Sequence, residues 1–165
     1  MPGDGAAPWC EDAGAGLSEN TMYKRILVPT DGSEITARAI GAAVGLAKAL
    51  GAEIDTICVK EPFPYGAVAE MQPTPPQEFF DAQERAAARH VRVVIDACQA
   101  VGVIAHAATV EGLQPWEAIV AHAEKSGCDL LVMGSHGRSG LASLFLGSET
   151  QDVLKHTKIP VLVIR

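Results

Sequence analysis

The chain has 165 residues, of which 48% are hydrophobic, so it is long enough for one domain with a buried core and too short for two to be expected. Its formal net charge of -7 and its scattered Lys and Arg residues argue against nucleic acid or an acidic membrane as a partner. The four cysteines are widely spaced and lack the CxxC pattern of a zinc site, which favours reduced thiols.

Residues 1–21 are rich in Gly, Ala and small polar residues without periodicity, which predicts a flexible extension before a single domain over residues 22–165. This segment lacks the basic start and the apolar stretch of a signal peptide. No apolar run in the chain approaches the roughly 20 residues of a membrane span. We therefore expect a cytoplasmic protein without a membrane partner.

Strand and helix patterns alternate along the rest of the chain. Short apolar runs predict strands at residues 25–29, 53–59, 103–110, 129–133 and 159–164. Apolar residues at three- and four-residue intervals predict helices at about 34–50, 77–101, 115–126 and 148–156. The proline-rich residues 62–76 cannot be regular structure throughout. The alternation predicts an α/β fold, a doubly wound five-stranded parallel sheet with helices on both faces.

In such a sheet, ligands bind outside the carboxyl ends of the strands, where the strand order reverses. The loop at residues 134–148 follows the fourth strand and is rich in glycine. Glycine lets several main-chain N–H groups point toward one site, and the helix that opens at Ser148 adds free amides and a positive dipole. Ser148 and Gln151 also have the spacing of a capping box. The loop suits an anion such as a triphosphate, although the same glycines could only shape a turn.

The spacing of this loop is similar to the nucleotide-binding signature of the ATP-binding branch of the universal stress protein family: GxxG, nine residues, then Gly followed by Ser or Thr. Gly134, Gly137, Gly147 and Ser148 match every fixed position. The segments YKRILVPTDGSE and KIPVLVIR also resemble this family, so the resemblance covers residues 22–165. It implies a Rossmann-like fold of the adenine nucleotide alpha hydrolase-like type, with ATP as ligand.

The resemblance further implies that Pro29, Thr30 and Asp31 border the adenosine, with the Asp31 carboxylate near the ribose or a metal. A carboxylate is suited to accept hydrogen bonds from ribose hydroxyls. Asp31 could instead only shape its turn through an Asx hydrogen bond. Val59 matches the position beside the adenine, and Met133 precedes the glycine loop in the same way. Both could equally belong to the core.

Polar residues next to the glycines are further candidates for the site. Thr150 could donate to phosphate or help bind Mg2+, and His136 and Arg138 could contact phosphate oxygens or lie in solvent. Glu149 is unusual here, because a carboxylate is favourable at a helix N-terminus yet repels a polyphosphate. We expect its side chain to point away if ATP binds. The remaining histidines, including His90, show no ligand spacing and are expected to be ordinary surface or partly buried residues.

The motifs for several enzyme classes are missing: GxxxxGKS/T, GxGxxG and GxSxG. The sequence therefore favours a nucleotide-dependent regulatory module in stress response. One alternative is a slow ATPase or nucleotide-dependent phosphotransferase on the same scaffold. Another is a family member that assembles through its surface and leaves the pocket empty, but the intact glycine spacing argues against it. The apolar last strand would leave an exposed sheet edge, which predicts a homodimer formed along that strand, as the resemblance also implies.

Overall fold

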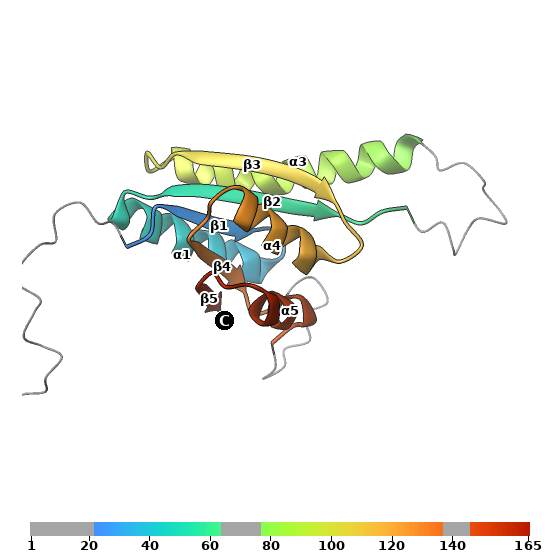
Figure 1. Cartoon of the computed structure of the whole chain (residues 1–165). Coiled ribbons are helices and arrows are strands. Elements are labelled where there is room, and N and C mark those ends of the chain that lie inside the picture. The colour runs from blue at the N-terminus through green and yellow to red at the C-terminus, as the bar shows by residue number, and fades with distance from the viewer. Residues whose placement is uncertain (1–21, 64–76, 137–145) are drawn as a thin grey trace, which may run out of the picture.

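The computed structural model describes residues 22–63, 77–136 and 146–165 (Figure 1). The expected N-terminal extension, most of the proline-rich stretch, and the predicted site residues Gly137 and Arg138 lie outside the described residues.

The described strands form one parallel sheet in the order β3-β2-β1-β4-β5 (Figure 1). The strands are β1 (Arg25–Pro29), β2 (Glu53–Lys60), β3 (Ala105–Glu111), β4 (Leu130–Gly134) and β5 (Val161–Ile164). The helices are α1 (Glu34–Leu50), α3 (Gln77–Gln99), α4 (Pro115–Lys125) and α5 (Ser148–His156). The chain moves outward from β1 to β3 and then returns to place β4 on the other side of β1. The predicted doubly wound α/β fold is confirmed.

Helices cover both faces of the sheet, and each face has its own apolar core. Successive strand residues point to opposite faces, so Ile26 joins the core under α1 and α3, while Leu27 joins the core under α4 and α5. Val94 of α3 and Val153 of α5 are fully buried in these two cores. Burial of such a side chain contributes roughly 1.5–3 kcal/mol. The apolar runs at residues 25–29 and 130–134 therefore reflect central strands that are buried on both faces.

Two strands begin two residues later than predicted. The third begins at Ala105 instead of 103, because the Val103 N–H donates to the carbonyl oxygen of Cys98 and closes the end of α3. The last begins at Val161 instead of 159. Pro160 has no N–H for the ladder, although its carbonyl oxygen accepts from the N–H of Leu131.

The predicted capping box at the start of α5 is wrong. The N-cap is Gly147, which has no side chain with which to cap the helix end. Ser148 is already the first helical residue, so its hydroxyl is not at the capping position. The Gln151 side chain instead donates from Nε2 to the carbonyl oxygen of Leu146, at 2.6 Å. The first amides of α5 therefore receive no side-chain cap from the N-cap residue.

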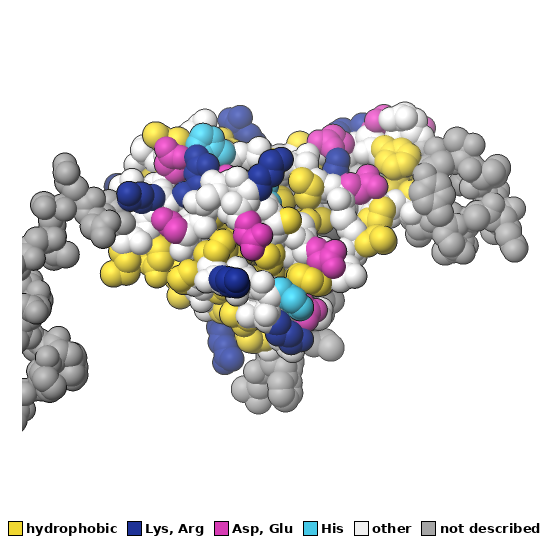
Figure 2. Space-filling view, viewed as in Figure 1, with side chains coloured by type: hydrophobic (Ala, Val, Ile, Leu, Met, Phe, Trp, Pro, Cys, Tyr) yellow, Lys and Arg dark blue, Asp and Glu magenta, His cyan; other side chains and the backbone are white. Residues whose placement is uncertain are grey.

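The remaining composition-based expectations concern thiols and charge. Cys58, Cys98 and Cys128 are buried, as predicted, and Cys98 and Cys128 are free thiols. On the face drawn in Figure 2, Lys and Arg side chains are interspersed with Asp and Glu and do not gather into one basic patch. Within the described part of the chain, no helix has the length and apolar character needed to cross a membrane.

Candidate functional site

A pocket of about 450 Å³ opens at the carboxyl edge of the sheet, where the strand order reverses between β1 and β4. Its size is that of a typical small-molecule site. The predicted site residues that line it are Pro29, Thr30, Asp31, Val59, Met133, Gly134, Gly147, Ser148, Glu149 and Thr150. The structure thus brings together every predicted site residue that it describes.

The turn between β1 and α1 holds Asp31 at the wall of the pocket. Asp31 Oδ1 accepts hydrogen bonds from the main-chain N–H of Ser33, at 3.0 Å, and from Thr36 Oγ1, at 2.7 Å. Ser33 is the predicted N-cap of α1, and its side chain accepts from the N–H of Thr36. The Asx turn is therefore real, yet Asp31 also lines the pocket. Shaping the turn and facing a ligand are compatible roles for this residue.

The end of β4 is tied to the start of α5 by a buried hydrogen bond. The hydroxyl of Thr150, which is 2% exposed, donates to the carbonyl oxygen of Gly134 at 2.9 Å. A threonine hydroxyl has one hydrogen, so in this arrangement it has none left for a phosphate oxygen. Its oxygen still has acceptor capacity that could face a cation.

Two glycines of the signature allow close approaches of the main chain. A Cβ at Gly134 would lie 3.1 Å from Cγ2 of Ile35, on α1. A Cβ at Gly147 would lie 3.1 Å from the α-carbon of His136. Both distances are tighter than ordinary van der Waals contacts. Part of the signature is therefore explained by packing around the pocket, in addition to any contact with a ligand.

The Glu149 carboxylate reaches from α5 to α4. Its Oε2 accepts a hydrogen bond from the main-chain N–H of Trp116, at 2.9 Å. Trp116 lies in the first turn of α4, and its ring stacks on His156 of α5 with centroids 4.2 Å apart. The amino ends of α4 and α5 are therefore joined beside the pocket, and Glu149 lines the pocket itself.

Sequence reasoning missed the wall that α3 supplies. Ala86, Ala87 and His90 line the pocket, although His90 was expected to be an ordinary residue. The signal was present, because His90 lies one turn after Ala87 and next to Val91 on the apolar face of α3. The ring of His90 also lies against Gly32, where a Cβ would come within 2.1 Å of ring atoms Cε1 and Nδ1. Further lining residues are Thr36, Ile57, Cys58, Lys60, Glu61, Gln83, Pro115, Ile119 and His136.

The electrostatics of the pocket combine helix ends with a few charges. Residues from the first turns of α1, α4 and α5 line it, so the positive ends of three helix dipoles converge there. The positively charged side chain of Lys60 lines the pocket, and it forms an ion pair with Glu84. The described residues contain no group of three or more His, Cys, Asp or Glu side chains that could hold a metal by themselves. The helix ends favour negative charge, while the carboxylates of Asp31, Glu61 and Glu149 also line the pocket.

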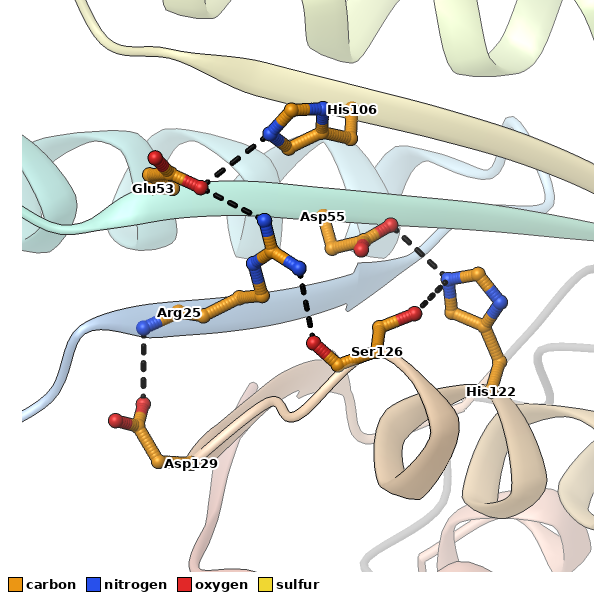
Figure 3. Close-up of polar contacts among 7 residues, drawn as sticks. All are labelled: Arg25, Glu53, Asp55, His106, His122, Ser126 and Asp129. Atoms are coloured by element: carbon orange, nitrogen blue, oxygen red, sulfur yellow. Dashed lines mark hydrogen bonds and ion pairs between the residues drawn. The ribbon is translucent and has the colours of Figure 1, made fainter.

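A second polar cluster lies at the opposite, amino-terminal edge of the sheet (Figure 3). Arg25 donates to Glu53 at 2.8 Å, and this hydrogen bond, followed by one from His106, lowers the pKa of the Glu53 carboxyl. His122 lies 3.0 Å from Asp55 and 3.3 Å from the hydroxyl of Ser126, in both cases through Nε2.

Because both partners of His122 use the same ring nitrogen, the imidazole does not bridge Ser126 to Asp55 as it would in a nucleophilic triad. The cluster joins β1, β2, β3 and the end of α4. We therefore assign it a structural role. Nearby, burial, followed by the charge of Asp55, raises the pKa of the Cys128 thiol to about 12, so this thiol stays protonated at neutral pH.

Comparison with known proteins gives a consistent result. Residues 22–165 match the model of the universal stress protein family. Universal stress protein MJ0531 of Methanocaldococcus jannaschii is 35% identical over 145 residues, which cover 87% of this chain and 83% of the relative.

Two solved structures resemble the fold closely. The structure of protein MJ0577 from the same organism has a TM-score of 0.73 and 31% identity, with 87% of this chain and 96% of that chain covered. A universal stress protein solved in complex with cAMP has a TM-score of 0.60 and 28% identity, with 87% and 97% covered.

Proposed function

The chain belongs to the universal stress protein family, and we propose that it binds ATP or a related adenine nucleotide as a regulatory module in stress response. The observation that carries this proposal is the pocket at the switch point of the sheet. It gathers ten residues, from distant parts of the sequence, that the glycine signature, its neighbouring residues and the family resemblance predicted.

The adenine would pack in the apolar part of the pocket, against Val59, Met133 and Ala87. These side chains are apolar and uncharged, which suits an aromatic base. Val59 and Met133 also pack into the core under α4 and α5, so their positions are rigid. A rigid apolar slot favours a purine ring because little conformational entropy is lost when the ring enters.

The ribose would lie beside Asp31, whose carboxylate is held by the turn before α1. The phosphates would lie at the uncapped amino end of α5, near Gly147 and Ser148, where amide N–H groups and the helix dipole favour negative charge. Mg2+ prefers oxygen ligands, which Asp31, the Thr150 hydroxyl oxygen and the phosphates themselves could supply. When bound, the ion would neutralise part of the phosphate charge.

The relative solved with cAMP supports an adenine nucleotide as the ligand class. Nucleotide-stripped protein should melt at a higher temperature with ATP and Mg2+. At 100 times the dissociation constant, the stabilisation should be about 2.7 kcal/mol. GTP, ribose 5-phosphate and inorganic triphosphate are the controls. A shift with one of these and none with ATP, AMP or cAMP would move the site to another ligand class.

We propose binding in preference to turnover, on the ground that the sequence has no Walker A lysine. Multiple-turnover phosphate release at saturating ATP distinguishes the two functions. An enzyme would be established by two results together. The rate of phosphate release would increase in proportion to protein concentration, and a pocket variant that no longer binds ATP would release no phosphate.

We also propose a homodimer through β5, which lies at an edge of the sheet. Leu162 of β5 is a large apolar side chain on this sheet edge, and it is 41% exposed. Antiparallel pairing of two β5 strands about a two-fold axis would bury it and pair main-chain groups across the interface. In such a dimer the two pockets would be linked through β4 and β5.

A further inference from the structure

Glu149 substitutes for a missing cap on the neighbouring helix. The N-cap residue of α4, Gln114, makes no side-chain hydrogen bond to the helix end. The Glu149 carboxylate instead accepts from the N–H of Trp116, the second residue of α4, at 2.9 Å. An uncapped helix end otherwise leaves its first amides without partners. The contact therefore stabilises α4 and fixes the direction of a carboxylate.

The same carboxylate stands where the phosphates of a nucleotide would come. Glu149 is the second residue of α5, next to Ser148, and it lines the pocket with Gly147. It is only partly exposed, so solvent screens its charge incompletely. The amino end of α5 attracts an anion, while the adjacent carboxylate repels it.

We propose that Glu149 sets the phosphate-charge preference of the pocket, lowering its affinity for nucleoside polyphosphates relative to mononucleotides and the uncharged nucleoside. This inference rests on the proposed nucleotide site. It follows from the position of the charge, because repulsion grows with the charge of the ligand while the contacts to adenine and ribose stay the same. Glu149 is thus a specificity-determining residue.

The other charges around the pocket do not duplicate this effect. Asp31 belongs to the β1–α1 turn, on the side proposed for the ribose. Glu61 and Lys60 stand at the end of β2, and Lys60 is paired with Glu84 of α3. Three carboxylates line the described pocket. Glu149 alone among them lies on α5, the helix whose first amides are proposed to bind phosphate.

The test is Glu149→Gln, which removes the charge but keeps an oxygen that accepts from the Trp116 N–H. Affinities for adenosine, AMP and ATP are measured by calorimetry without divalent cations, at one ionic strength. We expect ATP affinity to rise on the order of tenfold, AMP affinity to rise less, and adenosine affinity to change by less than about twofold. Glu149→Leu loses both the charge and the acceptor. It should show the same changes in affinity as Glu149→Gln, with a lower melting temperature.

Glu117→Gln is the matched control, because Glu117 is an exposed carboxylate in the first turn of α4 that does not line the pocket. It should leave all three affinities unchanged. An equal change for the three ligands in Glu149→Gln, or a loss of ATP affinity, would overturn the inference while leaving the nucleotide site in place. Failure of the wild-type protein to bind any of the three at millimolar concentration would overturn the site itself.

Discussion

The imidazole ring of His90 lies against the α-carbon of Gly32, so that a Cβ at this glycine would come within 2.1 Å of two ring atoms. Gly32 also has a φ of 76°, a backbone angle that residues with a side chain rarely adopt. Two independent reasons therefore require glycine there. The contact links α3 to the turn that carries Asp31.

Gly32→Ala should lower the free energy of unfolding by more than the about 1–2 kcal/mol expected for the backbone conformation alone. His90→Ala in the same chain should restore the steric part of the loss and leave the backbone part. Urea unfolding of the wild type, both single variants and the double variant completes a double-mutant cycle. Additive losses would show that the ring moves aside without cost.

The hydrogen bond from Thr150 to Gly134 predicts a second stability difference. Thr150→Val has nearly the same shape but leaves the buried carbonyl oxygen without its donor, which should cost about 1–3 kcal/mol. Thr150→Ser keeps the hydroxyl and loses one methyl group, for which about 0.8 kcal/mol is expected. Urea unfolding should therefore rank wild type, then Ser, then Val. A Val variant as stable as the Ser variant would show that this bond contributes nothing.

The amino-terminal cluster predicts how stability depends on pH. Hydrogen bonds from Arg25 and then His106 lower the pKa of Glu53 in the folded state below its ordinary value of 4.5. The unfolded chain then binds the proton more readily, so the stabilisation is present above pH 4.5 and is lost as pH falls through the lowered pKa. Glu53→Gln should be less stable than wild type at pH 7, and the difference should shrink in acid.

The matching control for that experiment is Glu117→Gln. The Glu117 side chain is exposed and makes no hydrogen bond or ion pair with the described residues. The difference in free energy of unfolding between Glu117→Gln and wild type should not shrink as the pH is lowered, in contrast to that of Glu53→Gln. A Glu53 difference that stays constant between pH 7 and pH 3 would show that the ion pair does not shift the pKa.

The proposed β5 interface predicts the effect of a charge at the sheet edge. Leu162→Lys should weaken the dimer at least tenfold in sedimentation equilibrium, while the folded subunit persists, because Leu162 is already 41% exposed in the single chain. Val93→Lys on α3 is the control, at a 57% exposed position. Val163, which is half-buried, is a less clean test because its replacement also disturbs the subunit. A wild-type protein that sediments as a monomer at high micromolar concentration would rule out this interface.

The fold was predictable because its signals are local. Apolar runs such as residues 25–29 and 129–133 are buried on both sides, and each helix carries one apolar stripe, so the alternation of elements implied the parallel sheet. The errors lie at element ends, where single hydrogen bonds decide. Ser148 has the residue type and spacing of a cap, yet α5 begins at Ser148 itself.

The candidate site was predictable at the strand ends and at the start of α5, where the glycine signature and the family resemblance indicated it. Asp31 and Gly134 stand beside the carboxyl ends of β1 and β4, so topology indicated that they meet at one edge of the sheet, and the family resemblance gave them a role there. His90 comes from a helix whose distance from the sheet edge depends on side-chain packing. The partner of Glu149, the N–H of Trp116, depends on how α4 meets α5. The apolar face of α3 indicated that His90 faces the sheet, but no local pattern gives the distance of α3 from the pocket or the way in which α4 meets α5.

The central claim is that the pocket holds an adenine nucleotide, and calorimetry on nucleotide-stripped protein tests it most directly. The wild type should bind ATP saturably with one site per chain. Gly137→Val, at a signature position outside the described residues, should remain folded and lose the binding, because the nucleotide signature that this chain matches has glycine there. Unchanged ATP affinity in the folded Gly137→Val protein, or no binding to the wild type at millimolar ATP, would contradict the account.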